Sequence, residues 1–184
     1  MNKLKSVIVI LCVYLLLLGS LNAQETTGDP FIDLMIGQVA FSGGRVLQLA
    51  EAIPEDAYSW KPAEGVRTTS GAIAHLLGSL YGIPSMMGAE GMPEHITRDI
   101  DKTMTDKSEI IENLKGSMDF ATEFLKSYDT ANYDKIVKTP FGEYPQRFMI
   151  LIINNHIHEH LGQLIAYARS NNVTPPWSMP QDEN

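Results

Sequence analysis

The chain has 184 residues, one cysteine and a formal net charge of −8, with 44% hydrophobic and 20% charged residues. This length fits one domain, and the hydrophobic content suffices for a buried core, which excludes a chain that is disordered by composition. The acidic charge argues against the basic face that a nucleic-acid partner requires, and one cysteine excludes a disulfide framework or a Cys-x-x-Cys site.

Residues 1–23 are expected to be a secretory signal peptide. Lys3 and Lys5 provide a positive start, an unbroken apolar run of 12 residues follows at 7–18, and Ala23 precedes a polar stretch. The run is shorter than the ~20 residues of a membrane-spanning helix, although an uncleaved anchor is the alternative. Such a peptide would direct export to the periplasm or the medium. Its cleavage would remove the cysteine and change the net charge from −8 to −10. Membrane contact is then expected only through the signal peptide.

A short linker, residues 24–29, leads to a first helix over 30–53. Asp29 is a suitable N-cap, and the proline after it is favoured at the first helical position. Gly43 and Gly44 interrupt the helix and predict a bend or a close helix contact, since a glycine costs about 1 kcal/mol relative to alanine. They would also permit close approach in a homodimer. Apolar residues recur at helical spacing, namely Phe31, Leu34, Met35, Val39, Val46, Leu49 and Ile53.

The middle of the chain alternates loops with helices. Residues 54–67 lack a period and are predicted to form an ordered loop held down by Tyr58 and Trp60. A second, strongly apolar helix is predicted over 68–87. Residues 88–104, rich in glycine and proline, are predicted to form a second long loop.

The last part of the chain supplies two more helices. Asp106 is a predicted N-cap for a third helix that ends near Tyr128. A third connection follows, in which residues 133–139 have the pattern of a locally paired strand. The longest helix is predicted over 145–170, and the proline-rich tail from Val173 is predicted to be extended. The expected fold is therefore all-α, a four-helix bundle with long inter-helix loops.

Two histidines of the fourth helix have the spacing of a chelating pair. His156 and His160 are four residues apart, which places them one turn apart on one helix face. They share this face with apolar side chains, namely Met149, Ile152, Ile153, Leu164 and Tyr167. Because a buried imidazole needs a partner for each nitrogen, two of them on a core-facing stripe indicate a metal or a carboxylate nearby.

The second helix contributes a third imidazole. His75 lies in an almost entirely apolar stretch, so a satisfied core histidine is one interpretation. In a bundle, however, facing helices bring His75 within ligand distance of His156 and His160, which would make an open three-histidine metal site. His95 and His158 are expected to lie on the surface.

Three stretches of the chain resemble the DinB-like superfamily of damage-inducible and thiol-dependent metalloenzymes. They are 52–62 (AIPEDAYSWKP), 66–75 (VRTTSGAIAH) and 156–169 (HIHEHLGQLIAYAR), and the last contains the family's spaced histidines followed by Gly-Gln and Tyr-x-Arg. The resemblance spans residues 30–177 and leaves 178–184 as a tail. It implies a bundle whose helices run up, down, down and up.

The resemblance also implies a zinc or nickel ion held by His75, His156 and His160, the same histidines that spacing brings together. Relatives use low-molecular-weight thiols in transfer or isomerisation, whereas export makes hydrolysis of an unknown small-molecule substrate an equal alternative. Glu159 stands where many members have histidine. This departure affects the surroundings of the site and not its three ligands, so metal binding is still expected, whereas the substrate is not identified. Gln163, one turn after His160, is placed to orient a ligand.

The resulting hypothesis is an exported divalent-metal-binding enzyme, either a metal-dependent hydrolase or a thiol-dependent transferase. Two alternatives stay open: a metal-binding or dimerising helical bundle without turnover, and a structural bundle whose histidines are satisfied by water and carboxylates. The sequence names no catalytic residue and no single metal, because three imidazoles suit Zn, Ni, Cu or Fe.

Overall fold

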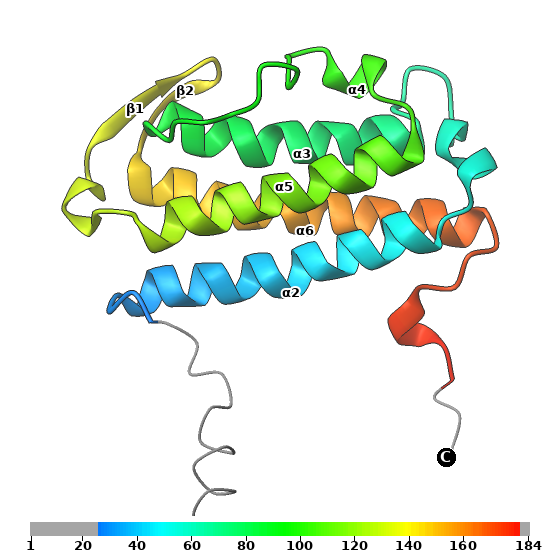
Figure 1. Ribbon diagram of the computed structural model, residues 1–184, viewed down its shortest axis with the longest axis horizontal. Coiled ribbons are helices and arrows are strands. Elements are labelled where there is room, and N and C mark those ends of the chain that lie inside the picture. The colour runs from blue at the N-terminus through cyan, green and yellow to red at the C-terminus, as the bar shows by residue number, and fades with distance from the viewer. Residues whose placement is uncertain (1–25, 181–184) are drawn as a thin grey trace, which may run out of the picture.

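Four long helices form the main body of the protein (Figure 1). The computed structural model describes residues 26–180, so the predicted signal peptide, 1–23, and the first part of the linker lie outside the described residues. The all-α prediction is confirmed for this range, in which helices dominate. Among the same residues, no helix is both long enough and apolar enough to cross a membrane. The long helices are α2 (Pro30–Ala52), α3 (Thr69–Met86), α5 (Lys107–Lys126) and α6 (Gln146–Ser170).

The helices follow an up-down-down-up order. In Figure 1, α2 and α6 run toward the right of the view, and α3 and α5 run toward the left. The helix α3 packs mainly on α5 and α6, and α2 packs mainly on the same two helices, so α2 and α3 occupy opposite corners of the bundle. As a result, α3 and α6 are antiparallel neighbours, and side chains from both can meet across one interface.

Three of the long helices begin within one residue of the predicted position. Asp29, Thr68 and Asp106 are N-caps, and each accepts a hydrogen bond from a backbone N–H of the first turn. A cap of this kind stabilises a helix by about 1 kcal/mol. The fourth long helix begins after Pro145 without a side-chain cap.

The first two connections contain more structure than predicted. The loop after α2 forms the 3₁₀ turn η1 (Glu55–Ser59), where the buried Tyr58 hydroxyl donates to the Ala50 carbonyl oxygen at 2.6 Å and holds the loop down as expected. The prediction of a plain loop over 88–104 is wrong at its end, where the short helix α4 (Ile100–Thr103) forms. It forms because its first side chain, an isoleucine, is buried against the core and fixes the turn on α3.

The third connection is a β-hairpin, and the tail is not fully extended. The strands β1 (Ile136–Thr139) and β2 (Gly142–Pro145) pair antiparallel, in agreement with the strand pattern at 133–139. The prediction of an extended tail is wrong at the 3₁₀ turn η3 (Pro176–Ser178). There the indole of Trp177 packs on the core and lies under the guanidinium of Arg45, 5.0 Å from it.

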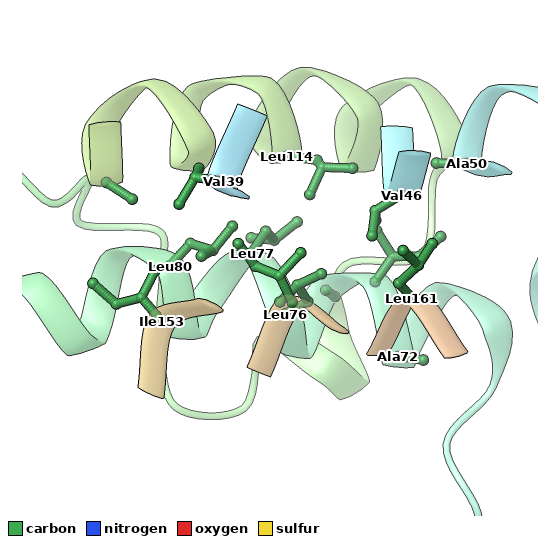
Figure 2. Packing of buried hydrophobic residues seen from close by; sticks show 14 of the residues in the cluster. Val39, Val46, Ala50, Ala72, Leu76, Leu77, Leu80, Leu114, Ile153 and Leu161 are labelled. Atoms are coloured by element: carbon green, nitrogen blue, oxygen red, sulfur yellow. The ribbon is translucent and has the colours of Figure 1, made fainter. Parts of the chain in front are cut away.

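All four long helices contribute side chains to one core. Figure 2 shows Val39, Leu76, Leu114 and Ile153, one from each helix, converging on the same interior. Leu34, by contrast, is 57% exposed although its spacing suggested the buried face. The buried face of α2 begins instead at Ile32, which lies about 160° around the helix from Leu34.

The predicted close helix contact lies at Gly43 but not at Gly44. A Cβ added to Gly43 would lie 2.6 Å from Met118 Sδ on α5, whereas one added to Gly44 would meet nothing within 4 Å. The absence of a side chain at Gly43 therefore lets α2 approach α5 within the bundle. Gly43 is therefore buried inside the bundle, and the possible homodimer stays a prediction.

Candidate metal centre

Three histidines from two neighbouring helices form a cluster. His75 lies in α3, and His156 and His160 lie one turn apart in α6. Each offers one ring nitrogen, and these three nitrogens lie within 4.8 Å of one another. The ring centroids are 5.1 Å apart in each pair that includes His75, and 4.5 Å apart for His156 and His160. The structure thus brings together the three histidines that the sequence singles out.

The cluster lies where the core meets the surface, and this position keeps the imidazoles neutral. His160 is 5% exposed, and the other two are partly buried. Burial lowers the pKa of His75 to about 4, with smaller contributions from the positive charge of Arg67 and from the other two histidines. Burial likewise lowers the pKa of His156 and of His160. A neutral imidazole has a free electron pair, which is the form that binds metal.

A chain of hydrogen bonds sets the tautomer of His160. The Tyr167 hydroxyl donates to the Arg67 carbonyl oxygen (3.2 Å), and it accepts a bond from Gln163 Nε2 (2.9 Å). The Gln163 amide oxygen therefore faces His160 Nδ1 at 2.8 Å. Because this oxygen only accepts, the proton of the neutral ring is on Nδ1, and Nε2 keeps its electron pair. Ordering by an outer partner is typical of metal-ligating histidines.

His156 has a polar side chain near each ring nitrogen. A carboxylate oxygen of Glu159 lies 3.5 Å from Nδ1, and Ser79 Oγ lies 3.1 Å from Nε2. The carboxylate beside Nδ1 is placed to orient the imidazole in the way that outer carboxylates orient zinc-bound histidines. Together with the neutral rings and the tautomer of His160, this arrangement fits a divalent ion, which three closely spaced histidines could bind.

The remaining two histidines lie apart from the cluster on the surface, as predicted. His158 is exposed and donates from Nδ1 to the carbonyl oxygen of Asn154 in its own helix (2.9 Å). His95 is exposed and donates from Nε2 to the side-chain oxygen of Asn113 (2.7 Å). Each imidazole therefore has a local partner that accounts for its orientation.

An ion pair and a cavity lie beside the cluster. Arg67 Nε is 2.9 Å from a carboxylate oxygen of Asp101. The positive charge of Arg67 depresses the pKa of all three clustered imidazoles, so it acts on the whole site. A cavity of about 430 Å³ borders the site and is lined by His75, His156, Asp101 and mostly apolar side chains. A cavity of this size is typical of small-molecule sites.

Sequence reasoning gave no role to Arg67 or Asp101. Arg67 stands in a stretch that resembles the family, directly before the N-cap of α3, but its charge alone indicates no partner. Asp101 lies in α4, inside a segment predicted to be a plain loop, and is 34 residues from Arg67. No local pattern links two such positions, because their contact depends on how the connection folds over α3.

The comparisons with known proteins agree on one family. The family described as the DinB superfamily matches residues 38–164, more than half of the chain. No curated protein matches. A solved DinB-like protein from Bacillus cereus ATCC 10987 is similar with a TM-score of 0.67 and 18% sequence identity, over 77% of this chain and 93% of that one.

Two further solved structures share the fold. A DinB-like protein from Bacillus subtilis has a TM-score of 0.62 and 19% identity, over 80% of this chain and 96% of that one. A mycothiol-dependent maleylpyruvate isomerase has a TM-score of 0.60 and 15% identity, over 77% of this chain and 63% of that one. At these identities the likeness establishes the fold and not the activity.

Proposed function

The chain belongs to the DinB superfamily, and from this premise we propose that it is a divalent-metal-binding enzyme whose ion is held by His75, His156 and His160. The observation that carries the proposal is the orientation of the His160 imidazole ring within the cluster. Gln163 holds its Nδ1 proton and leaves Nε2 with its electron pair, and each of the three histidines offers one ring nitrogen within 4.8 Å of the other two. Zinc or nickel suits such a nitrogen set.

The reaction class that fits is hydrolysis, or transfer to a thiol. A bound ion would supply Lewis acidity and so activate a water or thiol nucleophile near neutral pH. Gln163 holds the proton at His160 Nδ1, and Glu159 orients His156. The buried side of the site limits access of water, while the adjoining cavity admits a small substrate.

Thiol transfer is a specific candidate because of one structural neighbour. A solved protein of the same fold is named a mycothiol-dependent isomerase, which supports a low-molecular-weight thiol as one substrate to test. The signal-peptide pattern of residues 1–23 supports export to the periplasm or the medium. An exported protein meets a different supply of thiols from a cytosolic one, so hydrolysis by activated water is tested beside thiol transfer.

Metal content tests the site directly. The protein is purified without a histidine tag and without chelator, and its metals are measured by elemental analysis. His156→Ala should lose the divalent ion, whereas His158→Ala should keep it, because His158 lies on the same helix but faces away from the cluster. Chelation should lower the melting temperature of the wild type and of His158→Ala but not that of His156→Ala. A wild type without stoichiometric metal contradicts the proposal.

Catalysis needs a second assay. The metal-loaded protein is incubated with ester and amide substrates, and separately with a thiol and an electrophile, against chelated protein and His156→Ala as controls. Turnover that depends on the metal supports the enzyme. Tight metal binding without turnover on any of these substrates supports a metal-binding module instead.

A further inference from the structure

The cavity beside the histidine cluster has walls that are mostly apolar. It lies between α3, α6, the connection that contains α4, and the tip of the β-hairpin. Three isoleucines, Ile83, Ile96 and Ile100, are among the lining residues and are almost fully buried. A cavity with mostly apolar walls favours hydrocarbon over water, because a hydrocarbon ligand removes its own apolar surface and that of the exposed lining side chains from solvent.

Glycines on α3 leave room for a ligand. Gly78 and Gly82 both line the cavity, one helical turn apart. A Cβ added to Gly78 would meet a methyl group of Ile100 at 3.1 Å, whereas one added to Gly82 would meet nothing within 4 Å. Gly82 therefore faces open space in the cavity, and a side chain at this position would occupy that space without a backbone clash.

The mouth of the cavity exposes large apolar side chains. Met86, Met92 and Phe141 line it and are 40%, 41% and 57% exposed. They come from three separate elements, namely the end of α3, the following connection and the hairpin tip. Gathered apolar side chains at the entrance of a cavity are typical of a binding site, and methionine adapts its shape to varied ligands.

Among the described residues, one charged side chain of the cavity lining has no ion-pair partner. Asp101 is paired with Arg67, and the histidines that line the cavity are neutral near pH 7. Arg98 also lines the cavity, is exposed, and forms no ion pair with any residue of the described range 26–180. In a chain with a net charge of −8, this is a local positive site beside apolar walls.

We propose that the cavity binds a small amphipathic anion, with its hydrocarbon part along the isoleucines and Gly82 and its anionic group at Arg98. This inference rests on the proposed function, since it names the substrate class of the same site. The polar bond that reacts would lie at the end of the cavity formed by His75 and His156. A small carboxylate with a medium-length alkyl chain has the anionic group and the hydrocarbon part of such a ligand, without the reacting bond.

Octanoate is the probe, with hexanoate and octanol as its comparisons. Binding is measured by calorimetry on the purified protein and again after chelation, so that coordination of the carboxylate by a metal is separated from binding in the cavity. Octanoate should bind in both states. Two additional methylene groups should tighten binding by about tenfold relative to hexanoate.

Two substitutions test the two halves of the site. Gly82→Leu should fill the cavity and weaken octanoate at least tenfold, whereas Gly44→Leu, at an open helical glycine outside the cavity, should not. Arg98→Gln should weaken octanoate about fivefold without affecting octanol, as expected for one exposed ion pair. Lys102→Gln makes the same charge change at a residue that does not line the cavity, and it should have no effect.

The outcomes separate this inference from the metal proposal. Failure of octanoate to bind, or equal binding by Gly82→Leu and Gly44→Leu, overturns the cavity assignment even if the protein holds a metal. If Arg98→Gln weakens the binding of octanol and of octanoate equally, the assignment of the anionic group to Arg98 is overturned. Binding that depends on Gly82 in a protein without metal leaves the cavity assignment standing and removes the metal proposal alone.

Discussion

Gln163 is the residue that most directly fixes the orientation of His160. Gln163→Leu removes the 2.8 Å bond from His160 Nδ1 and the 2.9 Å bond to Tyr167. A neutral hydrogen bond contributes about 0.5–1.5 kcal/mol, and a buried N–H left without a partner costs about 1–3 kcal/mol. Because the His160 side chain is buried, the affinity for Zn²⁺ should fall by about 10- to 100-fold, the range found for lost outer partners of metal ligands.

A conservative variant separates orientation from folding. In Gln163→Glu the carboxylate still accepts a hydrogen bond from His160 Nδ1–H, so the affinity for Zn²⁺ should stay within a few-fold of that of the wild type. The hydrogen bond donated to the Tyr167 hydroxyl is lost. Affinity is measured by competition with a chromophoric chelator at fixed pH, and thermal unfolding of the chelated proteins checks their folding. If Gln163→Leu binds Zn²⁺ as tightly as the wild type, or if Gln163→Glu is as weak as Gln163→Leu, the reasoning is refuted.

Three further predictions concern stability and are measured by urea denaturation of chelated protein. The free energy of unfolding should fall as the pH drops from about 6.5 toward 4, because the unfolded chain takes up a proton at His75 that burial disfavours in the folded state. His75→Gln should flatten this part of the profile, and an unchanged profile would contradict the burial effect. Gly43→Val should lower the free energy of unfolding by about 1–3 kcal/mol, because the new side chain collides with Met118, whereas Gly44→Ala should raise it by up to about 1 kcal/mol. Equal effects of the two substitutions would exclude a close approach of α2 to α5 at Gly43. Tyr58→Phe should lose about 1 kcal/mol with the buried bond to Ala50, and no loss would mean that this bond does not hold the loop.

The parts of the site that the sequence predicts are those set by local geometry. The four-residue spacing of His156 and His160 is sufficient to place them on one face of any helix, whatever surrounds it. The N-caps Asp29 and Asp106 are predictable for the same reason, since each acts on the backbone two or three residues away. His75 needed one further assumption, that α3 and α6 face each other, and spacing alone left that open.

Elements fixed by distant contacts were not predictable. The short helix α4 has only four residues and no period, and it forms because its buried isoleucine docks on the core. The exposure of Leu34 has a similar origin, since the direction of the α2 face depends on where α5 and α6 lie. In each case local propensity permits several answers, and tertiary packing selects one.

The order of the helices explains why the site is built where it is. Because α3 and α5 run in the same direction, the chain must return along the bundle between them, over about 27 Å for the 18 residues of α3 (Figure 1). A bundle with simple alternation would need no such return, and it would place its second and fourth helices at opposite corners. The up-down-down-up order makes α3 and α6 neighbours, so that His75 meets His156. The returning connection then lies against α3 and brings Arg98 and Asp101 to the cavity beside those histidines. The long second connection is therefore a consequence of the topology, and it also supplies two charged residues of the cavity, Arg98 and Asp101.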